Sequence, residues 1–249
     1  MSSSLTPSVP VPDFGRRAET YDELRPGIPG LEEALVEAAD LRGRRVLDVG
    51  CGTGRLAEVL ATRFGARVWG VDAEPGMLNV ARRRSTPGLV FKSARAEQLP
   101  FKDGWFERAT MVLASHLVER PQAFAEIRRV LGPGGRLGLA TFDPAYFPQY
   151  YMGDLFPTFL EADLSRFPSA GTLDGELRGA AFASVTVQPF VRDAVIDRET
   201  ALERIRGKHI STFDLIPDEE YERGLARAER ELPDEIAYRW KMLIVVARR

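Results

Sequence analysis

The sequence predicts a doubly wound α/β fold, in which helices cover both faces of a mostly parallel β-sheet. From about residue 31 to 142, short apolar runs alternate with segments whose apolar residues recur at helical spacing. Such alternation is typical of right-handed βαβ units, which build a parallel sheet covered on both sides. The chain has 249 residues, 44% of them hydrophobic, which is enough to fill the core of one domain.

The first half of the chain supplies most of the expected elements. The predicted strands are short apolar runs, and they cover residues 45–49, 67–71, 89–92, 109–114 and 136–142. The predicted helices carry apolar residues three and four positions apart, and they cover residues 31–40, 54–64, a segment from 75, and 121–131. Pro75 and Pro121 suit the first turn of their helices, and Gly132 suits the position after a helix end.

The pattern changes after residue 142. Residues 142–167 hold eight aromatic side chains, which predict either an apolar pocket wall or a separate small core, and the two readings overlap. The remaining segments read as helices at 172–182, 198–206 and 217–231 and as strands at 183–191 and 241–247. We therefore expect one domain over residues 13–249, with a mobile helical cap built from about 142–170 and 198–235.

Composition limits the partners. Lys and Arg number 34 against 36 Asp and Glu, so the formal charge of −2 offers no general attraction to nucleic acid or to an anionic membrane. No apolar run approaches the roughly 18 residues of a membrane helix. One cysteine and two histidines, without carboxylates at ligand spacing, predict no metal site. The interpretation is a cytoplasmic protein, a monomer or homodimer, with no nucleic-acid or membrane partner.

The first twelve residues form a segment rich in serine and proline. They lack a basic start and an unbroken apolar stretch, so they do not resemble a signal peptide. We expect residues 1–12 to be a disordered tail.

A glycine-rich loop, residues 50–54, connects the first predicted strand to a helix. Its glycines let the backbone turn tightly and approach a ligand closely. Arg55 stands where the dinucleotide-binding fingerprint has its last glycine, and Asp48 lies just before the loop. Since Asp48 would repel a pyrophosphate and attract an ammonium group, the loop suits a zwitterionic amino-acid tail.

Asp72 lies at the carboxyl end of the second predicted strand. A carboxylate at this position accepts hydrogen bonds from both hydroxyls of a ribose. The alternative is an aspartate that caps the following helix. The nearby glycine loop favours ribose binding.

Five segments, in order along the chain, resemble the class I S-adenosylmethionine-dependent methyltransferases, specifically the small-molecule group called type 11 or UbiE-like. They are residues 18–26, 48–54, 70–78, 94–101 and 128–135. The resemblance covers roughly residues 14–142 and is loose in the last third of the chain. It implies a seven-stranded Rossmann-like sheet whose final strand is antiparallel. It also implies transfer of a methyl group from S-adenosyl-L-methionine to a small organic acceptor, giving S-adenosylhomocysteine.

The resemblance also assigns cofactor contacts to particular residues. Asp48 would lie near the ammonium group of the cofactor, Asp72 at the ribose and Met77 against the adenine. Arg95 departs from the family, which often has an aspartate at this position as an acceptor for the adenine amino group. The other expected cofactor residues are Gly50, Cys51, Gly52, Gly54, Ala73, Ala96, Glu97 and Ala114.

Residues for the transfer step are less sharply marked. His116 follows the fourth predicted strand, at the edge where such folds place their sites, and acts either as a base or as a packing and orienting residue. Tyr21 is expected to close over the cofactor, and Arg25 to hold a carboxylate of substrate or cofactor. Both also fit a purely helix-packing role.

Acceptor contacts are expected from the cap. The candidates are Tyr146, Tyr150, Tyr151 and His209, of which His209 also suits a structural role. The sequence is compatible with methylation of an oxygen, a nitrogen or a carbon atom of the acceptor. Two alternatives to small-molecule methylation remain: a protein that binds the cofactor without methyl transfer, and a protein or RNA methyltransferase, which the lack of a basic stripe disfavours.

Overall fold

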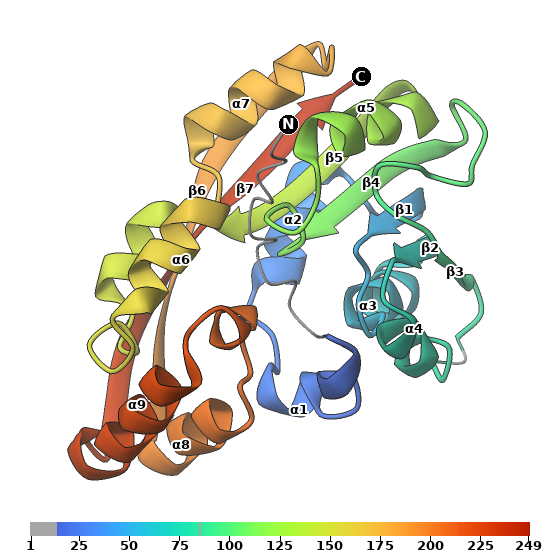
Figure 1. Ribbon diagram of the computed structural model, residues 1–249. Coiled ribbons are helices and arrows are strands. Elements are labelled where there is room, and N and C mark those ends of the chain that lie inside the picture. Colours follow the sequence, from blue (N-terminus) through green and yellow to red (C-terminus); the bar gives the residue numbers. More distant parts are fainter. Residues whose placement is uncertain (1–13, 85) are drawn as a thin grey trace, which may run out of the picture.

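The computed structural model describes residues 14–84 and 86–249, so the predicted tail at 1–12 lies outside the described residues. One seven-stranded sheet runs through the molecule in the order β3-β2-β1-β4-β5-β7-β6 (Figure 1). Strands β1 to β5 are parallel, and β7 is antiparallel to both of its neighbours. The predicted doubly wound, mostly parallel sheet with an antiparallel final strand is confirmed.

The element bounds follow the predicted alternation. The strands are β1 Arg45–Val49, β2 Arg67–Asp72, β3 Leu89–Ser93, β4 Phe106–Val112, β5 Leu131–Phe142, β6 Ser184–Asp197 and β7 Glu235–Arg248. The α-helices are α1 Tyr21–Leu24, α2 Leu31–Ala39, α3 Arg55–Phe64, α4 Pro75–Ala81, α5 Arg120–Val130, α6 Thr158–Arg166, α7 Ala170–Gly179, α8 Arg198–Arg206 and α9 Asp218–Glu231. The short 3₁₀ helices are η1 Gly15–Arg17, η2 Pro144–Gln149 and η3 Ser211–Asp214.

Two hydrophobic cores lie on opposite faces of the sheet. Phe124 and Ile127 of α5 are fully buried in a cluster that also includes residues of α7. On the other face, Leu35 of α2 and Leu60 of α3 are fully buried in a second cluster. The helical periodicity therefore predicted the inward faces of these helices correctly.

Two boundaries, one at each edge of the sheet, differ from the prediction. β4 ends at Val112 instead of residue 114, because Leu113 adopts a left-handed conformation with φ of 51° and the chain leaves the sheet. Leu131, predicted as the end of a helix, is instead extended and pairs with Phe106 at the start of β5. The earlier end of β4 places Ala114 and His116 in the loop above the carboxyl edge of the sheet.

β6 and β7 are much longer than predicted. Each has 14 residues, and the segment Val191 to Asp197 pairs with Glu235 to Lys241 as an antiparallel arm. The prediction missed this arm because it depends on cross-strand pairing, and most of its β6 side chains are exposed or half-buried. The arm extends beyond the other strands (Figure 1). The chain segment that connects β6 to β7 at the end of the arm contains α8 and α9.

The helical cap, residues 142–170 and 198–235, has a core of its own. Phe156 and Phe159 pack against Phe213 at ring-centre distances of 5.1 and 4.8 Å. Ile205 and Tyr221 belong to the same buried cluster. The two segments, 28 positions apart in sequence, thus form one layer beside the sheet.

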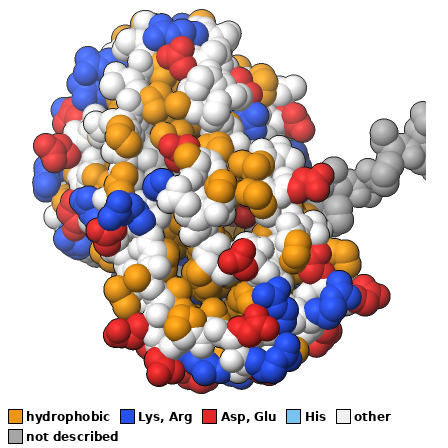
Figure 2. Space-filling view, turned by 90° about the vertical axis from the view of Figure 1, so that its left-hand side faces the viewer, with side chains coloured by type: hydrophobic (Ala, Val, Ile, Leu, Met, Phe, Trp, Pro, Cys, Tyr) orange, Lys and Arg blue, Asp and Glu red, His pale blue; other side chains and the backbone are white. Residues whose placement is uncertain are grey.

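The surface shown in Figure 2 is of mixed charge, and the helices are not of the membrane-spanning kind in the described part of the chain. Basic and acidic side chains are interspersed on the face that Figure 2 shows. Within residues 14–84 and 86–249, no helix combines the length and the apolar character that crossing a membrane requires.

Candidate active site

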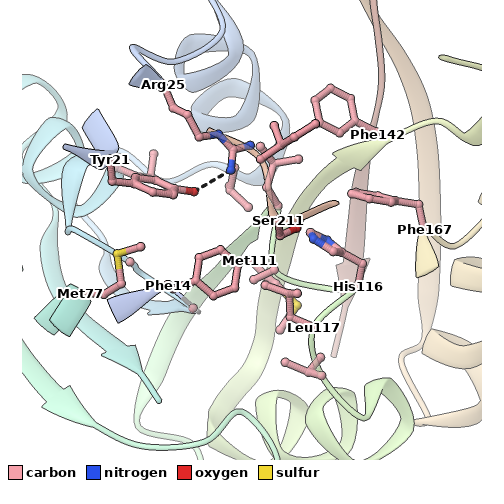
Figure 3. A pocket seen from close by; sticks show the side chains of 18 of the residues that line it. Phe14, Tyr21, Arg25, Met77, Met111, His116, Leu117, Phe142, Phe167 and Ser211 are labelled. Carbon is pink, nitrogen blue, oxygen red and sulfur yellow. Dashed lines mark hydrogen bonds between the residues drawn. The ribbon is translucent and has the colours of Figure 1, made fainter. Parts of the chain in front are cut away.

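A cavity of about 710 Å³ lies at the carboxyl edge of the sheet, between the glycine loop and the cap (Figure 3). Ligands of open α/β sheets bind outside the carboxyl ends of the strands. One side of the cavity is formed by the loop after β1, the end of β2 and the loop after β3, and the other by the aromatic segment, α6 and η3. The volume suits a cofactor together with a small second ligand.

Most of the predicted site residues meet in this cavity. Those that line it are Tyr21, Arg25, Gly50, Gly52, Asp72, Ala73, Met77, Arg95, Ala96, Glu97, Ala114, His116, Tyr146, Tyr150 and His209. Four predicted residues do not line it, namely Asp48, Cys51, Gly54 and Tyr151. The sequence therefore predicted correctly which segments form the site. It did not predict which of their residues line the cavity and which lie behind its wall.

The glycine loop packs closely against its surroundings. Gly50 has φ of 70°, and a Cβ atom there would lie 2.6 Å from the Cβ of Ala114. The backbone N–H groups of Gly50 and Cys51 both donate to the carbonyl of Val71, at 2.8 and 3.0 Å. Only glycine fits at position 50, because a side chain would meet Ala114 in a conformation that L-residues rarely adopt.

Two loop residues face away from the cavity. Gly54 contacts the ring of Phe91, since a Cβ atom on Gly54 would lie 2.7 Å from it. Cys51 is buried, and burial raises the pKa of its thiol well above the ordinary value. Gly54 thus serves packing, and Cys51 stays an unreactive thiol.

Asp72 is fixed from two sides by backbone donors. One carboxylate oxygen accepts from the N–H of Gly52 at 2.8 Å, and the other accepts from the N–H of Glu74 at 2.9 Å. Glu74, and not Asp72, is the capping residue of α4, where it accepts from the N–H of Gly76. A carboxylate has about four lone-pair positions, so Asp72 keeps acceptor capacity toward the cavity.

Asp48 lies at the end of β1, behind the glycine loop, and is almost fully buried. One of its oxygens accepts from the Thr110 hydroxyl at 2.7 Å, and the other has no hydrogen-bond partner among the described residues. Burial, and then the neighbouring Asp72, raise the pKa of its carboxyl to about 7, although the Thr110 hydrogen bond opposes this shift. A buried oxygen without a partner is costly, so a cationic ligand at the loop would stabilise it.

His116 lies in the middle of the cavity wall. Its imidazole stacks on the ring of Phe167 with the ring centres 4.0 Å apart, and its ring nitrogens are turned toward Ser211 (Figure 3). Nδ1 is buried and has no hydrogen-bond partner in residues 14–84 and 86–249. Burial, followed by the positive charges of Arg166, Arg25 and Arg120, lowers the pKa of His116 well below its ordinary value. The imidazole is therefore unprotonated at neutral pH, which is the form that a base requires.

Sequence reasoning missed a polar cluster in the cap wall. Arg166 donates to Asp163 at 2.8 Å, to Thr212 at 3.0 Å and to Ser211 at 3.2 Å, and Thr212 donates to Asp163 at 2.8 Å. These bonds join α6 to η3 and hence link the two segments of the cap. The spacing of Asp163 and Arg166 on one helix face was a detectable signal, whereas their partners, 45 to 49 residues further on, were not.

The amino-terminal helix α1 lies over the glycine loop. Arg25 donates to the Tyr21 hydroxyl at 2.9 Å, and its guanidinium lies 5.2 Å from the centre of the Tyr21 ring (Figure 3). Asp22 accepts from the Thr53 hydroxyl of the loop at 2.8 Å. Tyr21 and Arg25 lie between the two halves of the cavity (Figure 3). The hydrogen bond of Asp22 links α1 to the glycine loop.

His209 has a fixed tautomer. Its Nδ1 lies 2.9 Å from the backbone carbonyl of Arg204, which only accepts, so Nδ1 carries the proton and donates. Burial, with the positive charge of Arg25, lowers the pKa of His209 to about 3. Both cavity histidines are consequently neutral.

The aromatic segment forms a stacked wall. Phe142 stacks on Tyr146 at 4.9 Å and on Trp240 at 5.5 Å. Tyr146 is buried, and its hydroxyl has no hydrogen-bond partner in the part of the chain that the structure describes. Tyr150 packs against Tyr146 at 5.1 Å and against Tyr151 at 4.8 Å. The aromatic segment, residues 142–167, is thus both part of a hydrophobic core and a wall of the cavity. Both predicted roles of this segment, pocket wall and small core, therefore apply.

The chain resembles known methyltransferases. A family model described as "Methyltransferase domain" matches residues 46–135. A demethylmenaquinone methyltransferase of Thermus thermophilus is 32% identical over 200 residues, which are 66% of this chain and 91% of that relative. An uncharacterized methyltransferase of Mycobacterium tuberculosis is 40% identical over 126 residues, which are 51% of this chain and 50% of that relative.

A solved structure shows the same fold. A putative methyltransferase from an antibiotic biosynthesis pathway of Anabaena variabilis superposes with a TM-score of 0.70 at 22% identity. The superposition covers 89% of this chain and 98% of the other.

The chain belongs to the class I S-adenosylmethionine-dependent methyltransferases, in the UbiE-like group of small-molecule enzymes. S-Adenosyl-L-methionine is the cofactor of this class. The family, fold and cofactor that the sequence predicted are confirmed. The chain spans about half the length of several curated relatives that it matches.

Proposed function

We propose that the protein transfers the methyl group of S-adenosyl-L-methionine to a small organic acceptor, releasing S-adenosylhomocysteine. The observation that carries this proposal is that one cavity joins two chemically distinct halves. One half has the glycine loop and the fixed carboxylate of Asp72, and the other has an aromatic wall and the unprotonated His116.

The cofactor half fits S-adenosyl-L-methionine. Asp72 would accept from the ribose hydroxyls, and Met77 and Ala96 would contact the adenine. The unpartnered oxygen of Asp48 supplies negative charge behind the loop for the ammonium group. Arg25, which has only the Tyr21 hydroxyl as a polar side-chain partner among the described residues, is available for the cofactor carboxylate. The Arg95 side chain is 69% exposed and paired with Glu97, so the adenine contact would come from its neighbours.

The acceptor half supplies alignment and a dry environment. The cofactor carries its methyl group on a sulfonium sulfur, which leaves as a neutral thioether, so little charge needs stabilisation. His116 would take the proton of the acceptor as the new bond to the methyl carbon forms. The aromatic wall excludes water and holds a flat acceptor in line. We also infer that the cap selects the acceptor and that the protein works in the cytoplasm as a monomer or homodimer.

Turnover is the direct test of the proposed function. The purified protein would be incubated with S-adenosyl-L-methionine and fractionated small metabolites, and S-adenosylhomocysteine would be quantified by mass spectrometry. We expect product formation that depends on one or more fractions. Tight cofactor binding with no product from any fraction, compared with an active methyltransferase as control, would instead support a protein that only binds the cofactor.

Cofactor affinity should depend on pH through Asp48. The ionised carboxylate attracts the ammonium group, so affinity for S-adenosylhomocysteine should rise as the pH increases from about 6 to about 8, by up to about tenfold per unit below the pKa. The same raised pKa makes the ionised group a cost to the folded protein. The free energy of unfolding without cofactor should therefore fall as the pH rises from about 4 to about 7.

The variant Asp48→Asn separates these effects, because its amide does not ionise. We expect weaker binding at pH 8, a flat pH profile below it, and higher thermal stability of the cofactor-free protein than wild type. Calorimetry and thermal unfolding measured across the pH range would check both. An unchanged pH slope in the variant would assign the dependence to another group.

A further inference from the structure

We propose that the acceptor carries a carboxylate group and that Arg204 of α8 binds it. The proposal rests on the proposed function, since it concerns the acceptor half of the same cavity. It adds a substrate class, a planar organic acid, and a residue that determines specificity.

Arg204 lines the cavity and has no counter-charge within the described part of the chain. Its side chain is half-buried, and its polar side-chain partner is the Tyr238 hydroxyl at 3.4 Å. Among residues 14–84 and 86–249, no carboxylate forms an ion pair with Arg204. Arg206, two positions further along α8, is instead exposed and pairs with Glu199 at 3.3 Å and Glu229 at 2.9 Å.

The other charges in this half of the cavity are already balanced or assigned. Arg166 is paired with Asp163, and both lie largely buried in the cap wall. Arg25 lies between the two halves of the cavity, where it donates to the Tyr21 hydroxyl and where we assign it to the cofactor carboxylate. His116 and His209 are neutral. Among the described residues in this half, one guanidinium therefore remains for the acceptor, and an anionic group would form charge-assisted hydrogen bonds with it.

Packing places Arg204 at one end of the aromatic wall. Tyr238, whose hydroxyl Arg204 contacts, packs on Trp240 with ring centres 4.9 Å apart. Trp240 in turn stacks on Phe142 at 5.5 Å and on Tyr146 at 5.6 Å. Phe142 lies 5.9 Å from Phe167, on which His116 stacks.

This arrangement defines a direction for the acceptor. A planar molecule lying along the wall would place an anionic end at Arg204 and its opposite end toward His116. The planar fork of an arginine matches a carboxylate with two parallel hydrogen bonds, which a neutral amide of the same shape cannot reproduce. The unpartnered hydroxyl of Tyr146 is a further donor in the same wall.

Matched pairs of acids and amides test the charge directly. Calorimetry would compare benzoate, 4-hydroxybenzoate, cinnamate and 2-naphthoate with their own amides, on protein saturated with S-adenosylhomocysteine at low ionic strength. We expect at least one acid to bind about tenfold or more tightly than its amide. Arg204→Met should remove this preference, Arg204→Lys should keep part of it, and the control Arg206→Met should keep all of it.

The outcomes distinguish this inference from the proposed function. Every variant would first be titrated with S-adenosylhomocysteine, which also shows that it is folded. Failure of wild type to bind S-adenosylhomocysteine would contradict the proposed function itself. Cofactor binding without any preference for an acid, or a preference that Arg204→Met retains in full, would overturn the carboxylate site alone.

Discussion

Replacement of His116 with alanine should lower turnover by roughly 10²–10⁴-fold, while the affinity for S-adenosylhomocysteine stays nearly constant. The expected loss follows from the position of the imidazole in the acceptor wall and from its unprotonated state at neutral pH. Because burial and neighbouring arginines keep the pKa of His116 low, the turnover number should not fall through protonation of this residue between about pH 6 and 8. Steady-state kinetics with a saturating acceptor would measure both effects.

A phenylalanine at the same position separates chemistry from packing. His116→Phe retains a ring to stack on Phe167, where the native ring centres lie 4.0 Å apart, but it has no proton acceptor. If His116 is the base, the phenylalanine variant should be as slow as the alanine variant. Recovery of activity in His116→Phe, or a loss below about tenfold in His116→Ala, would instead show that the residue packs or orients the acceptor.

The second large effect concerns stability. Phe124→Ala should lower the free energy of unfolding by about 3–5 kcal/mol, because Phe124 is fully buried between α5 and the sheet. Cofactor affinity and acceptor kinetics of the protein that remains folded should change little, since Phe124 does not line the cavity. Denaturant unfolding followed by circular dichroism would give the stability loss.

Two neighbouring tyrosines supply the functional contrast. Tyr150 lines the cavity and Tyr151 does not, although their rings pack together at 4.8 Å. Tyr150→Ala should therefore change the KM or the turnover number for the acceptor much more than Tyr151→Ala, with cofactor affinity preserved in both. Equal acceptor kinetics in the two variants would mean that this segment is ordinary core.

Hydrogen exchange tests whether the cap is mobile. Slow hydrogen exchange in the cap, equal to that of the sheet, would show that the cap is not mobile.

The parallel half of the fold was predictable because its signals are local. Each strand up to β5 is an apolar run, and Pro75 and Pro121 mark the first turns of α4 and α5. The arm formed by β6 and β7 was not predictable in the same way. Its strand residues are stabilised by each other across the pair, and single-sequence periodicity does not record such pairing.

The site likewise has a part that local sequence patterns predict and a part that depends on tertiary packing. Asp72 and the glycine loop follow from a short contiguous pattern in which a strand leads into a helix, so their meeting was predictable. Asp163, Arg166 and Arg204 come from helices whose spatial relation depends on the packing of the cap core. Nothing in their sequence neighbourhood indicates a common cavity, and only the fold brings them to it.

Calorimetric titration with S-adenosylhomocysteine tests the central claim most directly, namely that the glycine loop and Asp72 form a cofactor site. Wild-type protein should bind S-adenosylhomocysteine and not NAD. Asp72→Ala should weaken this binding by roughly 10- to 150-fold through loss of charged hydrogen bonds to the ribose. The control Asp174→Ala, which removes an exposed carboxylate paired with Arg178, should bind as wild type does. Tight NAD binding, or equal affinities of Asp72→Ala and Asp174→Ala for S-adenosylhomocysteine, would contradict the assignment of the site.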